Sequence, residues 1–295
     1  MNHDGVWRFD VAYPLLARLP LRWANRLGDR MAGLDARRDQ ALRTAVGNGL
    51  RAVFPDRGTE HAAWIEEYAR CRVREAVDAW RMASLSDAEF QSLVRIEGLD
   101  QLFQLRAQGQ GVLFLMAHYG RLVMLLAALG RLGVRMNMLT MRIDTSNPDL
   151  SETQRRFLGR KVTNLRGQIG GQWLSLGDNL RPMYKSLEQG ETWIVLLDAY
   201  SPEFGAVCDF PFLGGTAHFP GGVRRIAAAT GARMVYGAVR DNGTTLNGRI
   251  DVLDADPVTA HGEAVACLER DVRAGPGQWW QWNILDYIWT PAHER

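Results

Sequence analysis

A histidine stands at residue 118, where an apolar run typical of a β-strand passes into one typical of a helix. The stretch reads FLMAHYGRLVMLL, from Phe114 to Leu126. An imidazole placed there is a candidate general base, because it titrates near neutral pH and can take a proton from a reacting group. Such a base often depends on a carboxylate that orients it. Five positions further on, however, stands Val123.

Other catalytic and metal-binding patterns are missing from the sequence. It has no Gly-x-Ser-x-Gly elbow, no phosphate-binding loop ending in Lys-Ser or Lys-Thr, and no His-Glu-x-x-His helix. The six histidines lie far apart, and the three cysteines lack the paired spacing of metal sites or disulfides. We therefore expect no metal, no cofactor and a reducing compartment. The net charge of +2 argues against nucleic acid as a partner.

The remaining pattern predicts an α/β fold behind a helical region. Residues 1–90 are expected to form N-terminal helices, and residues 91–295 an α/β domain packed with them into one compact unit. Strands are predicted at 112–117, 135–143, 191–198 and 233–240, separated by helical segments. Such alternation indicates a central, mostly parallel sheet covered on both faces. Because functional groups gather at the carboxyl ends of parallel strands, His118 and Asp198 should share one crevice.

Two other segments carry weaker signals. Residues 144–173 are polar and irregular, and are expected to form a loop over the site. Residues 7–31 mix aromatic and aliphatic side chains with five arginines, a composition that suits an anionic membrane surface or a helix packed on the body. No apolar run approaches the ~20 residues of a membrane span, and no signal peptide is evident. We expect a cytoplasmic protein, with peripheral contact at the inner membrane as a further option.

Several motifs, in a fixed order, resemble one enzyme family. They are NGLRAVFPDRG at 48–58, VRIEGLDQLFQLRAQGQGVLFLMAHYGRL at 94–122, LEQGETWIVLLDAYSPEFG and FPFLGG within 187–215, and GPGQWWQW at 275–282. Together they resemble the late acyltransferases of lipid A biosynthesis, within the lysophospholipid acyltransferase superfamily. The likeness runs from about Asn48 to Trp282. It implies that superfamily's fold and transfer of an acyl group from acyl carrier protein or acyl-CoA to a lipid or a small amine or hydroxyl acceptor.

The resemblance assigns His118 as the base and matches Asp198 to the family's first aspartate. The turn after the histidine, Tyr119 and Gly120, is a candidate oxyanion cradle, because helix amino ends offer free N–H groups. Arginines that serve the acceptor phosphate or the donor in the family fall near Arg155 and Arg156, with Arg160 and Arg166 as competitors. Further candidates for substrate contact are Arg121, Glu203 and Arg224.

The departures from the family pattern leave three interpretations. The family's acid after the histidine is Val123 here, its second aspartate is replaced within DAYSP, and its membrane helix is absent. First, another carboxylate reaches His118 through space, with Asp198, Glu203 and Asp209 as candidates. Second, the acceptor is an amine, which is partly neutral at pH 7 and needs less base. Third, the protein is an inactive relative that binds acyl chains or a partner protein.

Overall fold

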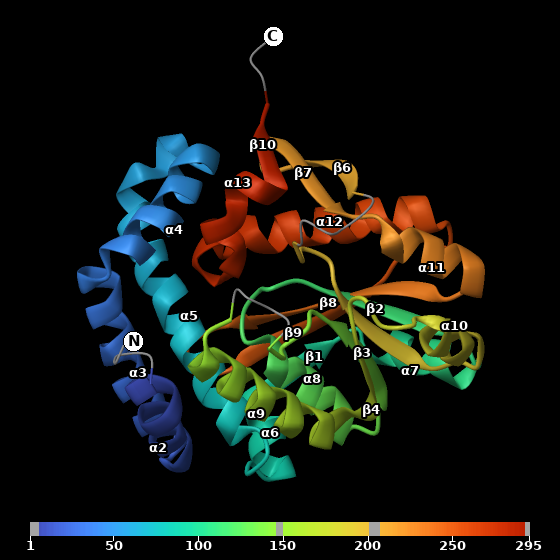
Figure 1. The fold of residues 1–295 in the computed structure, drawn as a ribbon, viewed down its shortest axis with the longest axis horizontal. Helices are drawn as coiled ribbons and strands as arrows, with labels where there is room; N and C mark the ends of the chain where they lie inside the picture. Colours follow the sequence, from blue (N-terminus) through green and yellow to red (C-terminus); the bar gives the residue numbers. More distant parts are fainter. Residues whose placement is uncertain (1–5, 146–149, 201–206, 293–295) are drawn as a thin grey trace.

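The computed structural model describes residues 6–145, 150–200 and 207–292 (Figure 1). Its central sheet has seven strands in the order β1–β9–β8–β2–β5–β3–β4. The strands are β1 (Val94–Glu97), β2 (Val112–Met116), β3 (Met136–Thr140), β4 (Gly170–Ser175), β5 (Thr192–Leu196), β8 (Arg233–Asp241) and β9 (Leu246–Val252). A smaller antiparallel sheet joins β10 (Trp289–Pro291), β7 (Gly215–Pro220) and β6 (Val207–Phe212).

Helices cover both faces of the central sheet. Figure 1 shows α11 and α12 on one side and α6, α8 and α9 on the other, with α2 to α5 stacked beside them. The α-helices are α2 (Tyr13–Arg18), α3 (Leu21–Arg38), α4 (Gln40–Val53), α5 (His61–Arg81), α6 (Asp87–Leu93), α7 (Leu99–Ala107), α8 (Leu122–Arg131), α9 (Glu152–Ile169), α10 (Arg181–Glu188), α11 (Gly222–Thr230), α12 (Pro257–Ala274) and α13 (Leu285–Ile288). Shorter helical turns are η1 (Arg8–Ala12), η2 (Pro55–Glu60), η3 (Pro276–Gln278) and η4 (Trp280–Ile284). None of the helices in the described ranges has the length and apolarity needed to cross a membrane.

The centre of the sheet explains why the strands read as continuous apolar runs. All five residues of β2 are buried, because helices pack on both of its faces. β2 pairs in parallel with β5 on one side and β8 on the other. The predicted fold class, a mostly parallel sheet flanked by helices behind an N-terminal helical region, is confirmed.

Two features of the topology were not predicted. β9 returns antiparallel to β8, and β1 pairs in parallel with β9, so this edge of the sheet runs opposite to the other strands. The smaller sheet adds the β6–β7 hairpin, which β10 extends near the carboxyl end of the chain. Both arrangements depend on pairings between strands whose local patterns do not specify direction.

The prediction of a loop over residues 144–173 was wrong for most of that segment. Residues 146–149 lie outside the described part, but Glu152–Ile169 form the long helix α9 and Gly170–Ser175 form β4. α9 begins with a capping box, in which Ser151 and Gln154 each bond the other's backbone N–H. Much of its surface is polar and exposed, so few apolar residues recur at a helical spacing in this segment.

α5 ties the N-terminal helices to the sheet through a buried arginine. The Arg74 side chain is 7% exposed; its guanidinium bonds Asp29 of α3 at 2.7 Å and Asp241 at the end of β8 at 2.9 Å. It also donates to the carbonyl oxygen of Gly243 at 3.0 Å. One side chain therefore joins three parts of the molecule that are far apart in sequence.

We predict that Arg74→Met lowers the free energy of unfolding by about 3 kcal/mol, because it leaves two carboxylates beside an apolar side chain. Urea unfolding followed by circular dichroism measures this, with the exposed Arg43→Met on α4 as a matched control. Both proteins should unfold in a single transition if the two regions form one compact unit. Two separate transitions in the wild-type chain would contradict that organisation, and an unchanged midpoint would contradict the role of Arg74.

Candidate active site

The strand register brings His118 and Asp198 together. Met116 at the end of β2 pairs with Leu196 at the end of β5, and each of the two polar residues follows two positions later. The Nδ1 atom of His118 lies 2.9 Å from Oδ1 of Asp198. The backbone N–H of His118 also lies 3.0 Å from both carboxylate oxygens. A residue 80 positions away in sequence thus supplies the carboxylate that position 123 lacks.

The pair fixes which ring nitrogen of His118 can act as a base. An ionised carboxylate only accepts hydrogen bonds, so Nδ1 carries a proton and donates it to Asp198. Nε2 is then the nitrogen with the free lone pair. The His118 side chain is 26% exposed, whereas Asp198 is fully buried. The imidazole is therefore partly exposed, whereas its carboxylate partner is held away from solvent.

The C-terminal aromatic segment clamps this pair. The indole N–H of Trp279 donates to Oδ2 of Asp198 at 2.8 Å. The side-chain amide of Gln281 donates to the carbonyl oxygen of Asp198 at 2.8 Å. The backbone N–H of Trp280 bonds the carbonyl oxygen of His118 at 2.8 Å. In the sequence, these contacts were indicated by the family-like motif at residues 275–282, but the motif did not show which groups its side chains bond.

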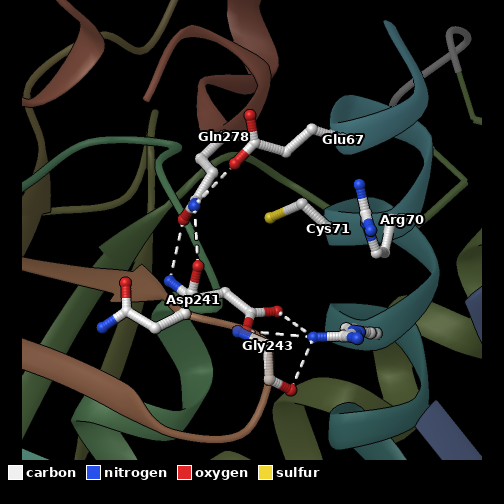
Figure 2. A pocket seen from close by; sticks show the side chains of 8 residues that line it. Glu67, Arg70, Cys71, Asp241, Gly243 and Gln278 are labelled. Carbon is white, nitrogen blue, oxygen red and sulfur yellow. Dashed lines mark hydrogen bonds and ion pairs between the residues drawn. The ribbon is translucent and has the colours of Figure 1, made fainter. Parts of the chain in front are cut away.

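Gln278 connects the turn that follows His118 to two other elements, and Figure 2 shows its contacts with Glu67 and Asp241. Its side-chain amide bonds Glu67 of α5 at 2.9 Å and both backbone groups of Asp241 at 2.8–2.9 Å. Its carbonyl oxygen accepts the backbone N–H of Gly120 at 2.9 Å. Glu67, Asp241 and Gln278 line a polar pocket of about 230 Å³ together with Cys71. Gln278 therefore braces the turn that carries His118, a role that the sequence did not suggest.

The predicted oxyanion cradle is not supported by the geometry. The backbone N–H of Tyr119 donates to the carbonyl oxygen of Ala117 at 2.7 Å, and that of Gly120 donates to Gln278, so neither is available. α8 begins only at Leu122, four residues after His118. The helix dipole therefore acts only weakly on His118, because its effect fades within the first turn of a helix. Gly120 has a different role: a Cβ there would lie 1.8 Å from the carbonyl oxygen of Val239.

Arg121 is placed away from any substrate, which corrects its prediction as a contact. Its side chain is 1% exposed, and its guanidinium bonds both oxygens of Asp78 on α5 at 2.6 and 2.7 Å. Burial alone would lower the pKa of Arg121, but the adjacent Asp78 and Asp241 carboxylates outweigh it and raise the pKa. Val123 is fully buried in the first turn of α8. Both residues serve the packing of α8 against its neighbours.

The remaining arginine and carboxylate candidates lie in different parts of the structure. Arg156 lies on the surface of α9, paired with Asp10 and Glu152 at 2.7 Å each. Arg155 is half-buried on the same helix. Asp209 pairs with His218 at 2.8 Å across the β6–β7 hairpin. Glu203 lies outside the described residues.

Arg224 of α11 contacts a buried histidine. Its Nε donates to Nδ1 of His261 at 3.0 Å, and its guanidinium lies 5.1 Å from the ring centroid of Phe210. Because arginine can only donate, Nδ1 of His261 must accept, and that imidazole is neutral. Burial first, and then the Arg224 charge, lower the pKa of His261 to about 4. The structure thus gives Arg224 a partner within the protein.

In the described part of the chain, no group of three or more His, Cys, Asp or Glu side chains is placed to hold a metal ion. What the site offers is a proton acceptor, its orienting carboxylate and a rigid support. Such an arrangement suits proton removal from a hydroxyl or an amine during transfer of a group.

Comparisons with known proteins agree with the motifs. Residues 4–282 match a protein-family model described as bacterial lipid A biosynthesis acyltransferase. Over 213 residues, the chain is 26% identical to lipid A biosynthesis acyltransferase 2 of Shigella flexneri, covering 70% of this chain and 60% of the relative. The chain therefore spans less than two thirds of that curated relative's length.

The depressed pKa of His261 predicts a loss of stability in mild acid. In the unfolded chain this histidine gains its proton as the pH falls through about 6.5, whereas in the folded protein it stays neutral down to about 4. Below pH 6.5 the unfolded chain therefore binds a proton that the folded protein does not, which stabilises the unfolded state. We expect the free energy of unfolding to fall by about 2 kcal/mol between pH 7 and pH 5 through this residue. Urea unfolding at both pH values, compared between wild type and His261→Gln, measures the effect. An equal loss in the two proteins would show that His261 does not cause it.

Proposed function

Because the chain belongs to the bacterial lipid A biosynthesis acyltransferase family, we propose that it transfers an acyl group from a thioester to a hydroxyl or amine acceptor. The donor is an acyl group on acyl carrier protein or on coenzyme A. The observation that carries the proposal is the hydrogen bond between His118 Nδ1 and the buried Asp198 carboxylate. It supports the first of the three interpretations, because a carboxylate does reach His118 although position 123 is a valine.

The chemistry follows from this pair. Nε2 of His118 takes the proton from the acceptor hydroxyl as its oxygen attacks the thioester carbonyl carbon, forming a tetrahedral intermediate. Asp198 stabilises the imidazolium that forms, and its hydrogen bond keeps the ring in the reactive tautomer. The intermediate then collapses, the carbon–sulfur bond breaks, and the imidazolium returns its proton to the leaving thiolate. An amine acceptor attacks in its neutral form, and His118 takes the proton afterwards from the intermediate.

The pair of His118 and Asp198 also favours catalytic activity over the third interpretation, an inactive relative that binds acyl chains. Asp198 is fully buried and receives hydrogen bonds from the His118 backbone, the His118 ring and Trp279. A binding protein has no need to orient an imidazole in this way. Holding the ring in one tautomer is a requirement of proton transfer.

We predict that His118→Ala lowers the rate of acyl transfer by about 10²–10⁴-fold, the usual contribution of a general base. Asp198→Asn should approach the same loss with hydroxyl acceptors, because the ring loses its orienting carboxylate. The assay follows release of free thiol from acyl-carrier-protein and acyl-CoA thioesters mixed with pooled hydroxyl or amine acceptors. A smaller loss for Asp198→Asn with amines would identify the amine as the acceptor.

Asp209→Asn is the matched control, since its carboxylate pairs with His218 and not with His118. That variant should keep the wild-type rate. If wild type releases no thiol with any acceptor pool, or if His118→Ala turns over as fast as wild type, the proposed function is wrong.

We further propose that the N-terminal helices contact an anionic membrane surface. Four exposed apolar side chains recur at intervals of four residues along the first helical segment: Trp7, Val11, Leu15 and Leu19, 37–55% exposed. On α3, Trp23 and Leu27 are 45% and 37% exposed. This spacing places each set on one side of its helix. Apolar stripes left exposed in this way suit the boundary between lipid headgroups and acyl chains.

Arginines flank these stripes. The guanidinium groups of Arg22 and Arg26 lie 5.9 and 5.8 Å from the ring centroid of Trp23. Each basic residue near an anionic bilayer contributes about 1 kcal/mol to binding. The combination supports peripheral contact with lipids that carry negative charge.

Sedimentation with vesicles tests this contact. We expect binding to vesicles of phosphatidylcholine with 30% phosphatidylglycerol, weakened by salt, and at least tenfold weaker binding of the double variant Leu15→Ser/Trp23→Ser. The control is Leu132→Ser, which removes an apolar side chain that is 43% exposed elsewhere. Undiminished binding of the double variant, or equal binding to pure phosphatidylcholine, would contradict the proposal.

A further inference from the structure

A cavity of about 440 Å³ lies between the N-terminal helices, α5 and α9. We call it the N-terminal cavity. Most of its wall is apolar and includes Phe9, Tyr13, Phe157 and Trp280. Its size and wall are typical of sites for small molecules, which usually combine an apolar lining with a few placed polar groups.

The cavity reaches the candidate active site through Trp280. That indole lines the cavity, and its ring centroid lies 5.8 Å from the His118 ring centroid. The Trp280 backbone also bonds the carbonyl oxygen of His118. Trp280 therefore links the cavity to the candidate active site.

A buried carboxylate in the cavity wall has one oxygen without a partner. The Glu75 side chain is 4% exposed, and its Oε1 accepts a hydrogen bond from Lys161 of α9 at 2.8 Å. Its Oε2 is buried and has no hydrogen-bond partner among the described residues. Leaving such an acceptor unsatisfied is costly, and a ligand that donates a hydrogen bond removes that cost.

The charges of the cavity wall further restrict the chemical class of the ligand. Arg8 bonds Asp35 at 2.6 Å and Lys161 bonds Glu75, so two of the three cations are neutralised inside the protein. The third, Arg72, lies 4.5 Å from the Trp280 ring centroid. The wall thus carries three positive and two negative groups, a net charge of +1. This balance does not suit a ligand with several negative charges, and a bare acyl chain would leave Glu75 unsatisfied.

We propose that the N-terminal cavity is the acceptor subsite and takes an amphiphile with an apolar body, at most one negative charge, and a hydroxyl that donates to Glu75 Oε2. The assignment as acceptor subsite rests on the proposed acyl transfer, whereas binding in the cavity does not. Arg72, at the Trp280 side, faces any single anionic group. The reacting hydroxyl or amine of the same molecule points to His118.

Binding can be measured without turnover, using 1-O-decylglycerol as the probe. Its dimethyl ether has the same chain but no hydroxyl, and serves as the matched ligand. Isothermal titration calorimetry on the full chain should show at least tenfold tighter binding of 1-O-decylglycerol. This binding measurement needs no acyl donor and no turnover, which keeps it separate from the test of catalysis.

Lysine labelling locates the probe. The sequence has only two lysines, Lys161 in the cavity and the exposed Lys185 on α10. Reductive methylation followed by mass spectrometry should show protection of Lys161 by 1-O-decylglycerol, with Lys185 unchanged as an internal control. Binding without protection of Lys161 would place the probe elsewhere and overturn the proposal.

Glu75→Gln tests the recognition. The glutamine amide can keep its oxygen hydrogen-bonded to Lys161, but its NH₂ group then faces the cavity in place of Oε2. The preference for 1-O-decylglycerol over its dimethyl ether should therefore fall at least tenfold. Glu66→Gln, on an exposed position of the same helix, should keep it. Equal affinity of wild type for the two probes, or an unchanged preference in Glu75→Gln, would contradict the inference. The wild-type comparison decides even if Glu75→Gln does not fold.

Discussion

The buried carboxylate of Asp198 is the constraint on which the site depends. It is fully removed from solvent, so its charge must be compensated by donors within the protein. These donors are the backbone and ring of His118 and the indole of Trp279. The end of β2, the end of β5 and the C-terminal segment must therefore all be in place for Asp198 to be satisfied. The same contacts hold the His118 ring in one tautomer, so the energetic need of the carboxylate and the chemical need of the base are met together.

α5 has a comparable role in the support of the site. It carries Arg74, Glu75 and Asp78, each of which bonds a side chain of another element. Asp78 receives Arg121 from the histidine turn, and Arg74 reaches the end of β8. Breaking one partner of such a buried pair leaves a charge uncompensated, so these contacts specify one arrangement of the helices on the sheet. The N-terminal helices are in this way coupled to the candidate active site, although they supply no reacting group.

The proposed acceptor subsite and the proposed membrane contact lie on the same N-terminal region. η1 and α2 contribute Phe9 and Tyr13 to the wall of the cavity, while Val11 and Leu15 of the same segment are exposed. An amphiphile taken from a membrane surface would need only a short path to reach the cavity. This arrangement would give the basic, aromatic N-terminal helices a function in acceptor selection.

The sequence by itself determined the fold class and singled out His118 as the candidate base. Apolar runs that end in His118 and Asp198 predicted buried parallel strands with polar residues at their carboxyl ends, and the motifs indicated the family. The sequence was less informative for α9, because the polar surface of this helix leaves few apolar residues at a helical spacing. It was also less informative for β9 and the β6–β7 hairpin, because no local pattern encodes the direction in which these strands pair. Only the tertiary structure decided that Asp198 replaces the acid missing at Val123, that Arg121 is an internal ion-pair partner, and that the turn N–H groups are already bonded. The physical reason is that local periodicity is enough to identify a strand. The partner of a buried charge instead depends on which distant groups the strand register brings within hydrogen-bond distance.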